Sequence, residues 1–222
     1  MEWLDRLFVF TELALINMLL SGDNAVVIAM AARRLPHAER KRAVWWGAAA
    51  AVLLRCALTL GAVIVLDIPY LQTVGAILLL LIAMKLALDR DDRHKQTPSS
   101  STLAGAVWTI IVADLVMSLD NVLAVAAIAE QEVALLVIGI AMGIPIIIWG
   151  SSFIMRLLDR APWLTYAGGM LLAYTAGKMM LHDEGLNRLL PQMSGNVRQA
   201  LPYIAVAVLL AAVLWIRRKR AT

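Results

Sequence analysis

The chain has 222 residues, of which 61% are hydrophobic and only 16% are charged. Soluble domains are usually about 45–50% apolar and about 25% charged, so this composition excludes an ordinary soluble protein and indicates a polytopic membrane protein. The net charge of +4 comes from basic residues beside apolar segments, which is typical of membrane topology signals and not of nucleic-acid binding. The single cysteine, Cys56, excludes a disulfide within the chain and a cysteine-rich metal site.

The apolar segments predict an all-α fold with seven transmembrane helices. We expect these helices over residues 7–32, 44–66, 70–88, 102–129, 133–157, 162–181 and 201–216. The fifth is interrupted by Gly143 and Pro145. Residues 89–101 form a polar linker, and residues 182–199 form a loop of amphipathic character.

The distribution of Lys and Arg predicts the orientation of these helices. Basic residues follow the first, third and fifth segments and form the C-terminal run at 217–220, whereas the other loops carry few. By the positive-inside rule, the N-terminus lies outside and the C-terminus lies in the cytoplasm.

A polar motif, Ser-x-Asp-Asn, occurs twice inside long apolar segments, at residues 21–24 and 118–121. Six positions before each motif aspartate stands a further polar residue, Asn17 in the first copy and Asp114 in the second. An ionised carboxylate at the bilayer centre costs about 2.5–3.5 kcal/mol even on the lenient insertion scale. We therefore expect a proton, a basic side chain or a metal ion to compensate these acids.

The duplication extends beyond the motif. Pro69 and Lys85 recur as Pro162 and Lys178, at nearly the spacing that separates the two motifs. This predicts two copies of a three-helix unit, residues 7–88 and 102–181, followed by an extra, peripheral helix at 201–216. Because each copy has an odd number of spans, the second is inverted, as in many secondary transporters whose ion site lies at the bilayer midplane.

Helical spacing favours a metal ion over the other compensating groups. Asp114, Ser118 and Asn121 share one helix face, and their counterparts in the first copy are spaced in the same way. Gly22 can relax the first helix locally and free carbonyl oxygens, which Leu119 cannot do as easily. The predicted metal ligands are Asp23, Asn24, Asp114, Asp120, Asn121 and Asn17. These oxygen ligands suit Mn²⁺, Mg²⁺ or Ca²⁺ better than Cu⁺ or Zn²⁺.

Five further residues are candidates for supporting roles. Ser21 and Ser118 either assist the metal or simply hydrogen-bond a neighbouring helix. Arg55 is too central to reach the interface and is expected to pair with a motif carboxylate when no metal is bound, or to hold a nearby carbonyl. Lys178 is either a counter-ion or a snorkelling side chain. Glu12 is a ligand or proton carrier of the outer vestibule, or else a surface residue.

The paired motif in a chain with seven predicted spans resembles the TerC family of integral membrane proteins, a family within the wider group of LysE-like exporters. Residues 21–25, followed by Ala-Ala-Arg-Arg-Leu-Pro, look most like its YjbE-type branch. The resemblance covers almost the whole chain. It implies efflux of divalent metal, chiefly Mn²⁺, across the bacterial inner membrane, with the family's acidic and amide metal residues falling on Asp23, Asn24, Asp114, Asp120 and Asn121. Asn17 stands where the second copy has an acid, so the two halves differ.

We therefore predict a secondary metal exporter, not an enzyme, in which rocking of the two repeats exposes a midplane ion to the outside. One alternative is the export of amino acids or other small solutes, although clustered aspartates suit a substrate carboxylate poorly. A seven-helix photoreceptor or an intramembrane aspartyl protease ranks below transport, because the last helix has no internal lysine and the protease motifs are absent. Gly139 and Gly143 form a Gly-xxx-Gly pair that can seat a helix of the same chain or of a second copy in a homo-oligomer.

Overall fold

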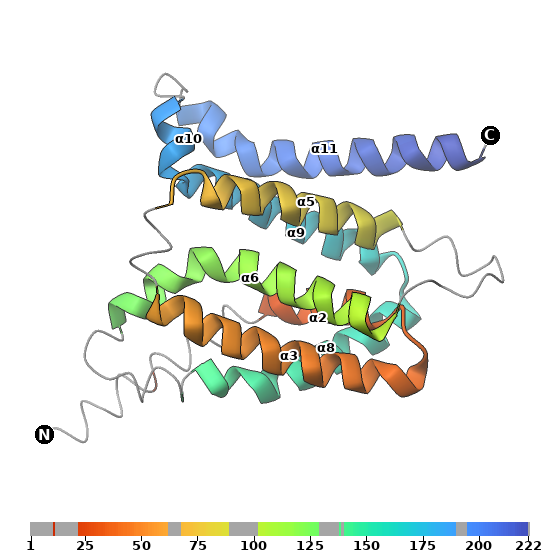
Figure 1. Ribbon diagram of the computed structural model, residues 1–222. Coiled ribbons are helices and arrows are strands. Elements are labelled where there is room, and N and C mark those ends of the chain that lie inside the picture. Colours follow the sequence, from red (N-terminus) through yellow and green to blue (C-terminus); the bar gives the residue numbers. More distant parts are fainter. Residues whose placement is uncertain are drawn as a thin grey trace, which may run out of the picture. The chain divides into compact units, whose positions relative to one another are not determined.

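The computed structural model describes Thr11 and residues 22–61, 68–88, 102–128, 138, 140–189 and 195–221, with the backbone alone at 120–128, 184, 189, 195–196 and 220–221. All regular structure within these residues is helical (Figure 1), as the composition predicts. The helices are α2 (Gly22–Ala32), α3 (His37–Leu60), α5 (Leu71–Leu88), α6 (Leu103–Ile128), α8 (Gly143–Arg160), α9 (Leu164–His182), α10 (Glu184–Leu189) and α11 (Gly195–Ala221).

Several helix ends differ from the sequence prediction, and the reason is physical. α3 begins at His37 and includes basic residues that were assigned to a loop, while α11 begins at Gly195 and extends to Ala221. Hydropathy marks the hydrocarbon layer, whereas a helix can continue into the polar headgroup region. The loop predicted at 182–199 is also wrong, because it contains α10 and the first turns of α11. The interruption of the fifth span is predicted at Gly143 and Pro145, whereas the structure has a turn at Met142 and places both residues in the first turn of α8.

Three of the described helices are long and apolar enough to cross a membrane: His37–Leu60, Leu71–Leu88 and the segment Val197–Lys219 within α11. Gly22–Ala32 and Leu103–Leu119 are shorter apolar segments. The count of seven spans stays a prediction, as does the Gly-xxx-Gly interface, since Gly139 lies outside the described residues.

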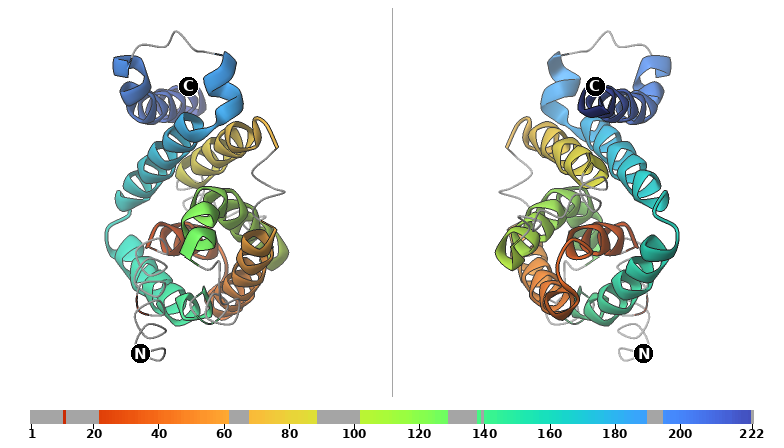
Figure 2. Two further views of the ribbon diagram at one scale, coloured as in Figure 1. Left: turned by 90° about the vertical axis from the view of Figure 1, so that its left-hand side faces the viewer. Right: turned by 90° about the vertical axis from the view of Figure 1, so that its right-hand side faces the viewer.

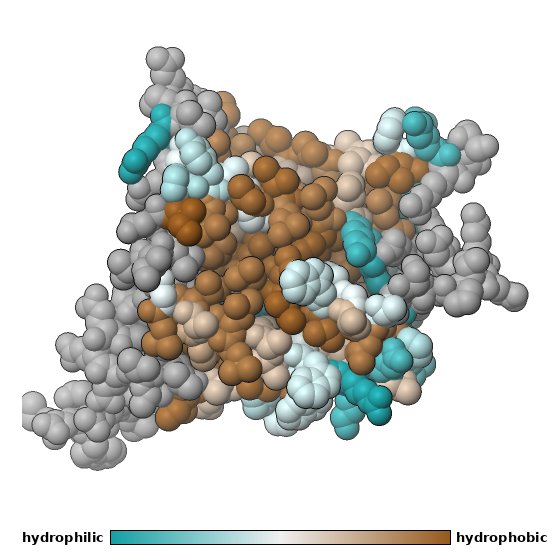
Figure 3. All heavy atoms as spheres, in the orientation of Figure 1, coloured by the Kyte–Doolittle hydropathy of each residue, from teal (hydrophilic) through white to brown (hydrophobic). Residues whose placement is uncertain are grey.

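Large apolar side chains are exposed on these helices. Leu53 is 71% exposed, and Val208 and Leu214 are 57% and 63% exposed. Hydrophobic residues dominate the face drawn in Figure 3. A water-soluble protein rarely exposes such a surface, whereas hydrocarbon chains solvate it readily, so this surface fits a lipid-embedded protein.

The described chain forms two compact units. The first combines residues 1–67 with residues 101–156 and so contains α2, α3, α6 and most of α8. In it α6 packs against both α2 and α3 (Figures 1 and 2). Gly47 of α3 faces Ile110 of α6 so closely that a Cβ at Gly47 would lie 2.8 Å from two Ile110 carbons. This close approach brings the polar residues of α3 and α6 together further along both helices.

The second unit combines residues 68–100 with residues 157–222 and contains α5, α9, α10 and α11. α9 packs antiparallel against both α5 and α11. Gly169 of α9 meets Ala87 of α5, and the rings of Tyr174 and Tyr203 join α9 to α11 with centroids 5.7 Å apart. The candidate span of α11 is 22% buried, against 44% for each of the other two, so α11 is the least enclosed of the three.

Asp183 caps two helices of the second unit at once. Its Oδ1 accepts the N–H of Leu186 (2.9 Å) in the first turn of α10, and its Oδ2 accepts the N–H of Thr73 (2.8 Å) in the first turn of α5. Burial favours the neutral acid, but the N–H donors outweigh it and hold the pKa of Asp183 below its usual value. Asp183 follows the end of α9 and lies outside the membrane-spanning segments.

Asp183→Ala is expected to lower the free energy of unfolding by about 1–2 kcal/mol, the usual cost of a lost N-cap. A depressed carboxyl pKa gives stability that is complete above the unfolded pKa of about 3.9 and is lost as pH falls through the folded pKa. The gap in melting temperature between wild type and variant should therefore be constant from pH 5 to 8 and narrow near pH 3. A gap that is equally wide at pH 3 would contradict this role of the carboxylate.

Candidate cation site

The second motif region places two polar side chains on one face of α6. Asp114 and Ser118 stand one turn apart, and the Ser118 hydroxyl donates to Asp114 Oδ2 at 3.2 Å. Asp114 is 4% exposed and Ser118 is fully buried. The i, i+4 spacing thus gives the shared face that the sequence predicts.

Arg55 of α3 reaches this face from the side. Its Nη2 forms an ion pair with Asp114 Oδ1 at 2.8 Å, and its Nε donates to Ser118 Oγ at 3.1 Å. Both charged side chains are about 95% buried. One turn along α3, Thr59 donates its hydroxyl proton to the Arg55 carbonyl at 2.8 Å. The sequence predicts a motif carboxylate or a nearby carbonyl as the partner of Arg55, and the carboxylate that it meets is Asp114, four positions before the second motif.

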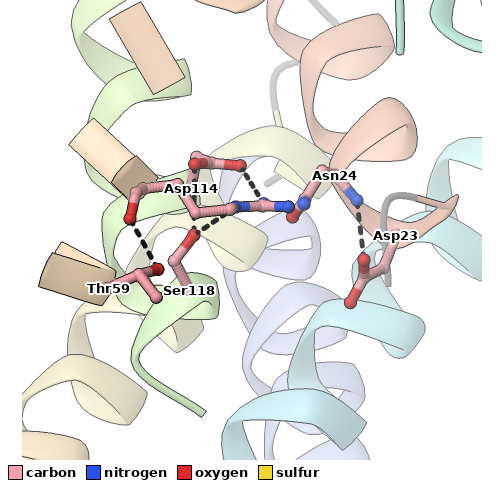
Figure 4. A network of polar contacts seen from close by, with 6 residues as sticks. Asp23, Asn24, Thr59, Asp114 and Ser118 are labelled. Carbon is pink, nitrogen blue, oxygen red and sulfur yellow. Dashed lines mark hydrogen bonds and ion pairs between the residues drawn. The ribbon is translucent and has the colours of Figure 1, made fainter. Parts of the chain in front are cut away.

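The first motif contributes Asp23 and Asn24 from the first turn of α2. Asp23 Oδ1 accepts the backbone N–H of Asn24 at 2.9 Å, and the Asn24 side chain is 2% exposed. Asp23 itself is only partly buried. Figure 4 shows the resulting polar group, to which α2, α3 and α6 of the first unit all contribute.

The chemistry of this group suits a small cation. It offers two carboxylates, a carboxamide and a hydroxyl, all of them hard oxygen donors. The two carboxylates exceed the one guanidinium in charge, so the described group is formally negative. Across the described residues no three His, Cys, Asp or Glu side chains lie together in a metal-binding cluster, so a cation here would need amide, hydroxyl or carbonyl oxygens as well.

Comparison with known proteins places the whole chain in one family. The model of the "Integral membrane protein TerC family" matches residues 3–221. The chain belongs to the TerC family. Its placement in a wider exporter group stays a prediction.

Three relatives from Bacillus subtilis (strain 168) are similar to this TerC-family chain. The uncharacterised membrane protein YjbE is 45% identical over 200 residues, which is 90% of this chain and 91% of that protein. The uncharacterised membrane protein YkoY is 27% identical over 74% of this chain and 56% of its own length. The uncharacterised membrane protein YceF is 27% identical over 76% and 68%. No solved structure matches.

The structure describes the side chains of only some of the predicted ligands of this TerC-family chain. Asp23, Asn24 and Asp114 come together in the first unit, with Ser118 and Arg55 beside them. For Asp120 and Asn121 the structure describes only their helical backbone in α6. Three predicted site residues, Glu12, Asn17 and Ser21, lie outside the described residues.

Lys178 belongs to the second unit. It is exposed on α9 in the second unit, and Lys85, its counterpart in the predicted repeat, is likewise exposed on α5. Exposure at both positions is what snorkelling lysines show.

Sequence reasoning missed Thr59 and Asp183. Thr59 stands four residues after Arg55, a spacing at which a threonine hydroxyl can bond the earlier carbonyl. Asp183 stands directly before a short amphipathic stretch, which is the position of a helix N-cap.

Proposed function

We propose that the protein is a carrier and not an enzyme: a secondary exporter of divalent cations in the bacterial inner membrane, with Mn²⁺ as the first candidate substrate. The observation that carries the proposal is the buried group of Asn24, Asp114, Ser118 and Arg55, with the partly buried Asp23 beside it, which joins three helices inside one compact unit. Buried ionisable groups within apolar helices are expensive, and they commonly mark ion pathways.

The donor set supports a hard cation. Carboxylate, amide and hydroxyl oxygens bind Mn²⁺, Mg²⁺ and Ca²⁺ well. An amino-acid exporter would instead need a buried cation open to the substrate carboxylate, and Arg55 is engaged by Asp114. A retinal protein would need a buried lysine for its Schiff base, and Lys178 is exposed.

Helix pairing supports the proposed inverted repeat. If α2, α3 and α5 correspond to α6, α8 and α9, a two-fold relation pairs α5 with α9 and α2 with α6, and both pairs are in contact. The same relation would pair α8 with α2 as it pairs α3 with α6, and among the described residues α8 approaches α2 at Gly150, where a Cβ would lie 3.4 Å from the Ala25 Cβ. If one repeat moves against the other, the side chains at these helix interfaces would have to repack.

The exposed tryptophans support the proposed orientation, in which the basic ends face the cytoplasm. Tryptophan prefers the membrane–water interface. Trp45 and Trp46 are exposed near the basic start of α3, and Trp215 is exposed near the basic end of α11. Trp108 and Trp163 are exposed shortly after basic stretches of the sequence, whereas Trp149 is exposed within α8. Near the C-terminal end of α11, Lys219 Nζ lies over the Trp215 ring, 4.6 Å from its centroid, so a basic residue and an interfacial tryptophan interact there.

The test is manganese tolerance in cells that lack their own manganese exporters. The protein should restore growth on high Mn²⁺, and Asp23→Asn combined with Asp120→Asn should abolish the protection. Glu39→Gln, a carboxylate-to-amide change in the first turn of α3, is the matched control and should protect like wild type. Protection by a double variant that is expressed normally would contradict the proposal.

Metal analysis of the purified protein decides the substrate class. The purified protein should bind Mn²⁺, and competition with Mg²⁺ and Zn²⁺ then ranks the three ions, with Mn²⁺ expected to displace Mg²⁺. Absence of bound Mn²⁺ would contradict the proposed site.

A further inference from the structure

Arg55 is a fixed positive charge in the interior of an apolar helix. It stands within α3, in a candidate membrane span, and its side chain is only 5% exposed. A guanidinium stays protonated in proteins, so this charge cannot be removed by titration. A charge of this kind is costly within a membrane and commonly functional.

The contacts of Arg55 involve the same oxygens that a cation would use. Its Nη2 donates to Asp114 Oδ1 at 2.8 Å, and its Nε donates to Ser118 Oγ at 3.1 Å. The Ser118 hydroxyl in turn donates to the other carboxylate oxygen, Asp114 Oδ2. A divalent cation that binds Asp114 Oδ1 would displace the guanidinium from that oxygen. The guanidinium and the cation are therefore alternative partners of Oδ1.

We infer that Arg55 is a built-in counter-ion that exchanges with the transported cation. Resting on the proposed function, this gives the transport cycle a return step: when the cation leaves, Arg55 moves onto Asp114 and the site returns with its charge compensated. Without Arg55 the emptied carboxylate would stay uncompensated in the low-dielectric interior while the carrier returns, at a large desolvation cost.

Two measurable consequences follow. Because Arg55 competes for Asp114, it reduces the apparent affinity for the cation by the fraction of sites it occupies. Because it compensates the empty site, it speeds the return of the empty carrier, which net efflux requires and cation–cation exchange does not. Arg55→Gln should therefore bind more tightly, retain exchange and lose net efflux.

The experiment uses the full chain in proteoliposomes loaded with radioactive Mn²⁺. Efflux is measured into Mn²⁺-free buffer and, separately, into buffer containing unlabelled Mn²⁺. For Arg55→Gln we expect net efflux to fall at least about tenfold while exchange stays within about threefold of wild type. Lys85→Gln, which removes an exposed positive charge from the candidate span of α5 and leaves the Arg55–Asp114 ion pair intact, is the control and should keep the wild-type ratio of net efflux to exchange.

A second variant covers the case in which Arg55→Gln does not fold. Arg55→Lys keeps the charge but lacks the planar fork that holds both Asp114 and Ser118, so it should compete less and lower the half-saturating Mn²⁺ concentration several-fold. An unchanged half-saturating concentration in Arg55→Lys, or equal losses of net efflux and exchange in Arg55→Gln, would overturn the inference. Absence of Mn²⁺ transport by wild type would instead refute the proposed function.

Discussion

Asp114→Ala is expected to lower the free energy of unfolding by about 3–5 kcal/mol, because it leaves the Arg55 guanidinium buried without its carboxylate. The pair is 95% buried and 2.8 Å long, so Arg55 would lose a charged partner at a place where water cannot replace it. Unfolding of the purified protein in detergent micelles, followed by circular dichroism, measures the loss.

Two further variants separate the charge effect from packing. Ser118→Ala removes one neutral hydrogen-bonding group from the same cluster and should cost about 1 kcal/mol. Arg55→Met combined with Asp114→Leu removes both charges and should recover most of the stability, since replacing a buried ion pair by apolar residues of similar size is often neutral or stabilising. A double variant as unstable as Asp114→Ala alone would show that packing, and not the stranded charge, sets the cost.

The local part of this site was predictable from the sequence. Asp114 and Ser118 share a face because helical periodicity requires it. Arg55 was expected to meet a motif carboxylate because a buried guanidinium needs one. The identity of that carboxylate was not predictable, since it depends on the register of α3 against α6. The close contact of Gly47 with Ile110 is part of that register, and it belongs to the packing of two distant segments.

Helix boundaries and caps show the same division between local and long-range information. Hydropathy located the apolar cores of α5, α6 and α9 well, but it missed the helical start of α3 at His37 because the first residues there are polar and basic. The double cap at Asp183 has one local partner, Leu186, and one distant partner, Thr73. Only the local half leaves a signature in the sequence.

Gly177→Ala is expected to destabilise the second unit by about 1–3 kcal/mol, the usual range for an overpacked site. A Cβ at Gly177 would overlap the Cα of Pro202 and lie 3.0 Å from both the Leu201 carbonyl oxygen and the Pro202 nitrogen. These are backbone atoms of α11, so no side-chain rotation can relieve the clash. The result would be a forced separation of α9 from α11.

Gly169→Ala, in the same helix α9, is the matched control. Its Cβ would lie 3.4 Å from the Ala87 Cβ, which is an ordinary contact. Alanine is favoured over glycine in a helix by up to about 1 kcal/mol, so Gly169→Ala should be neutral or stabilising. The two substitutions make the same chemical change in one helix, and opposite signs are expected in their melting temperatures. Equal melting temperatures would mean that α9 and α11 can separate at no cost, and that the seventh predicted span is held by its loop connection and not by packing at Pro202.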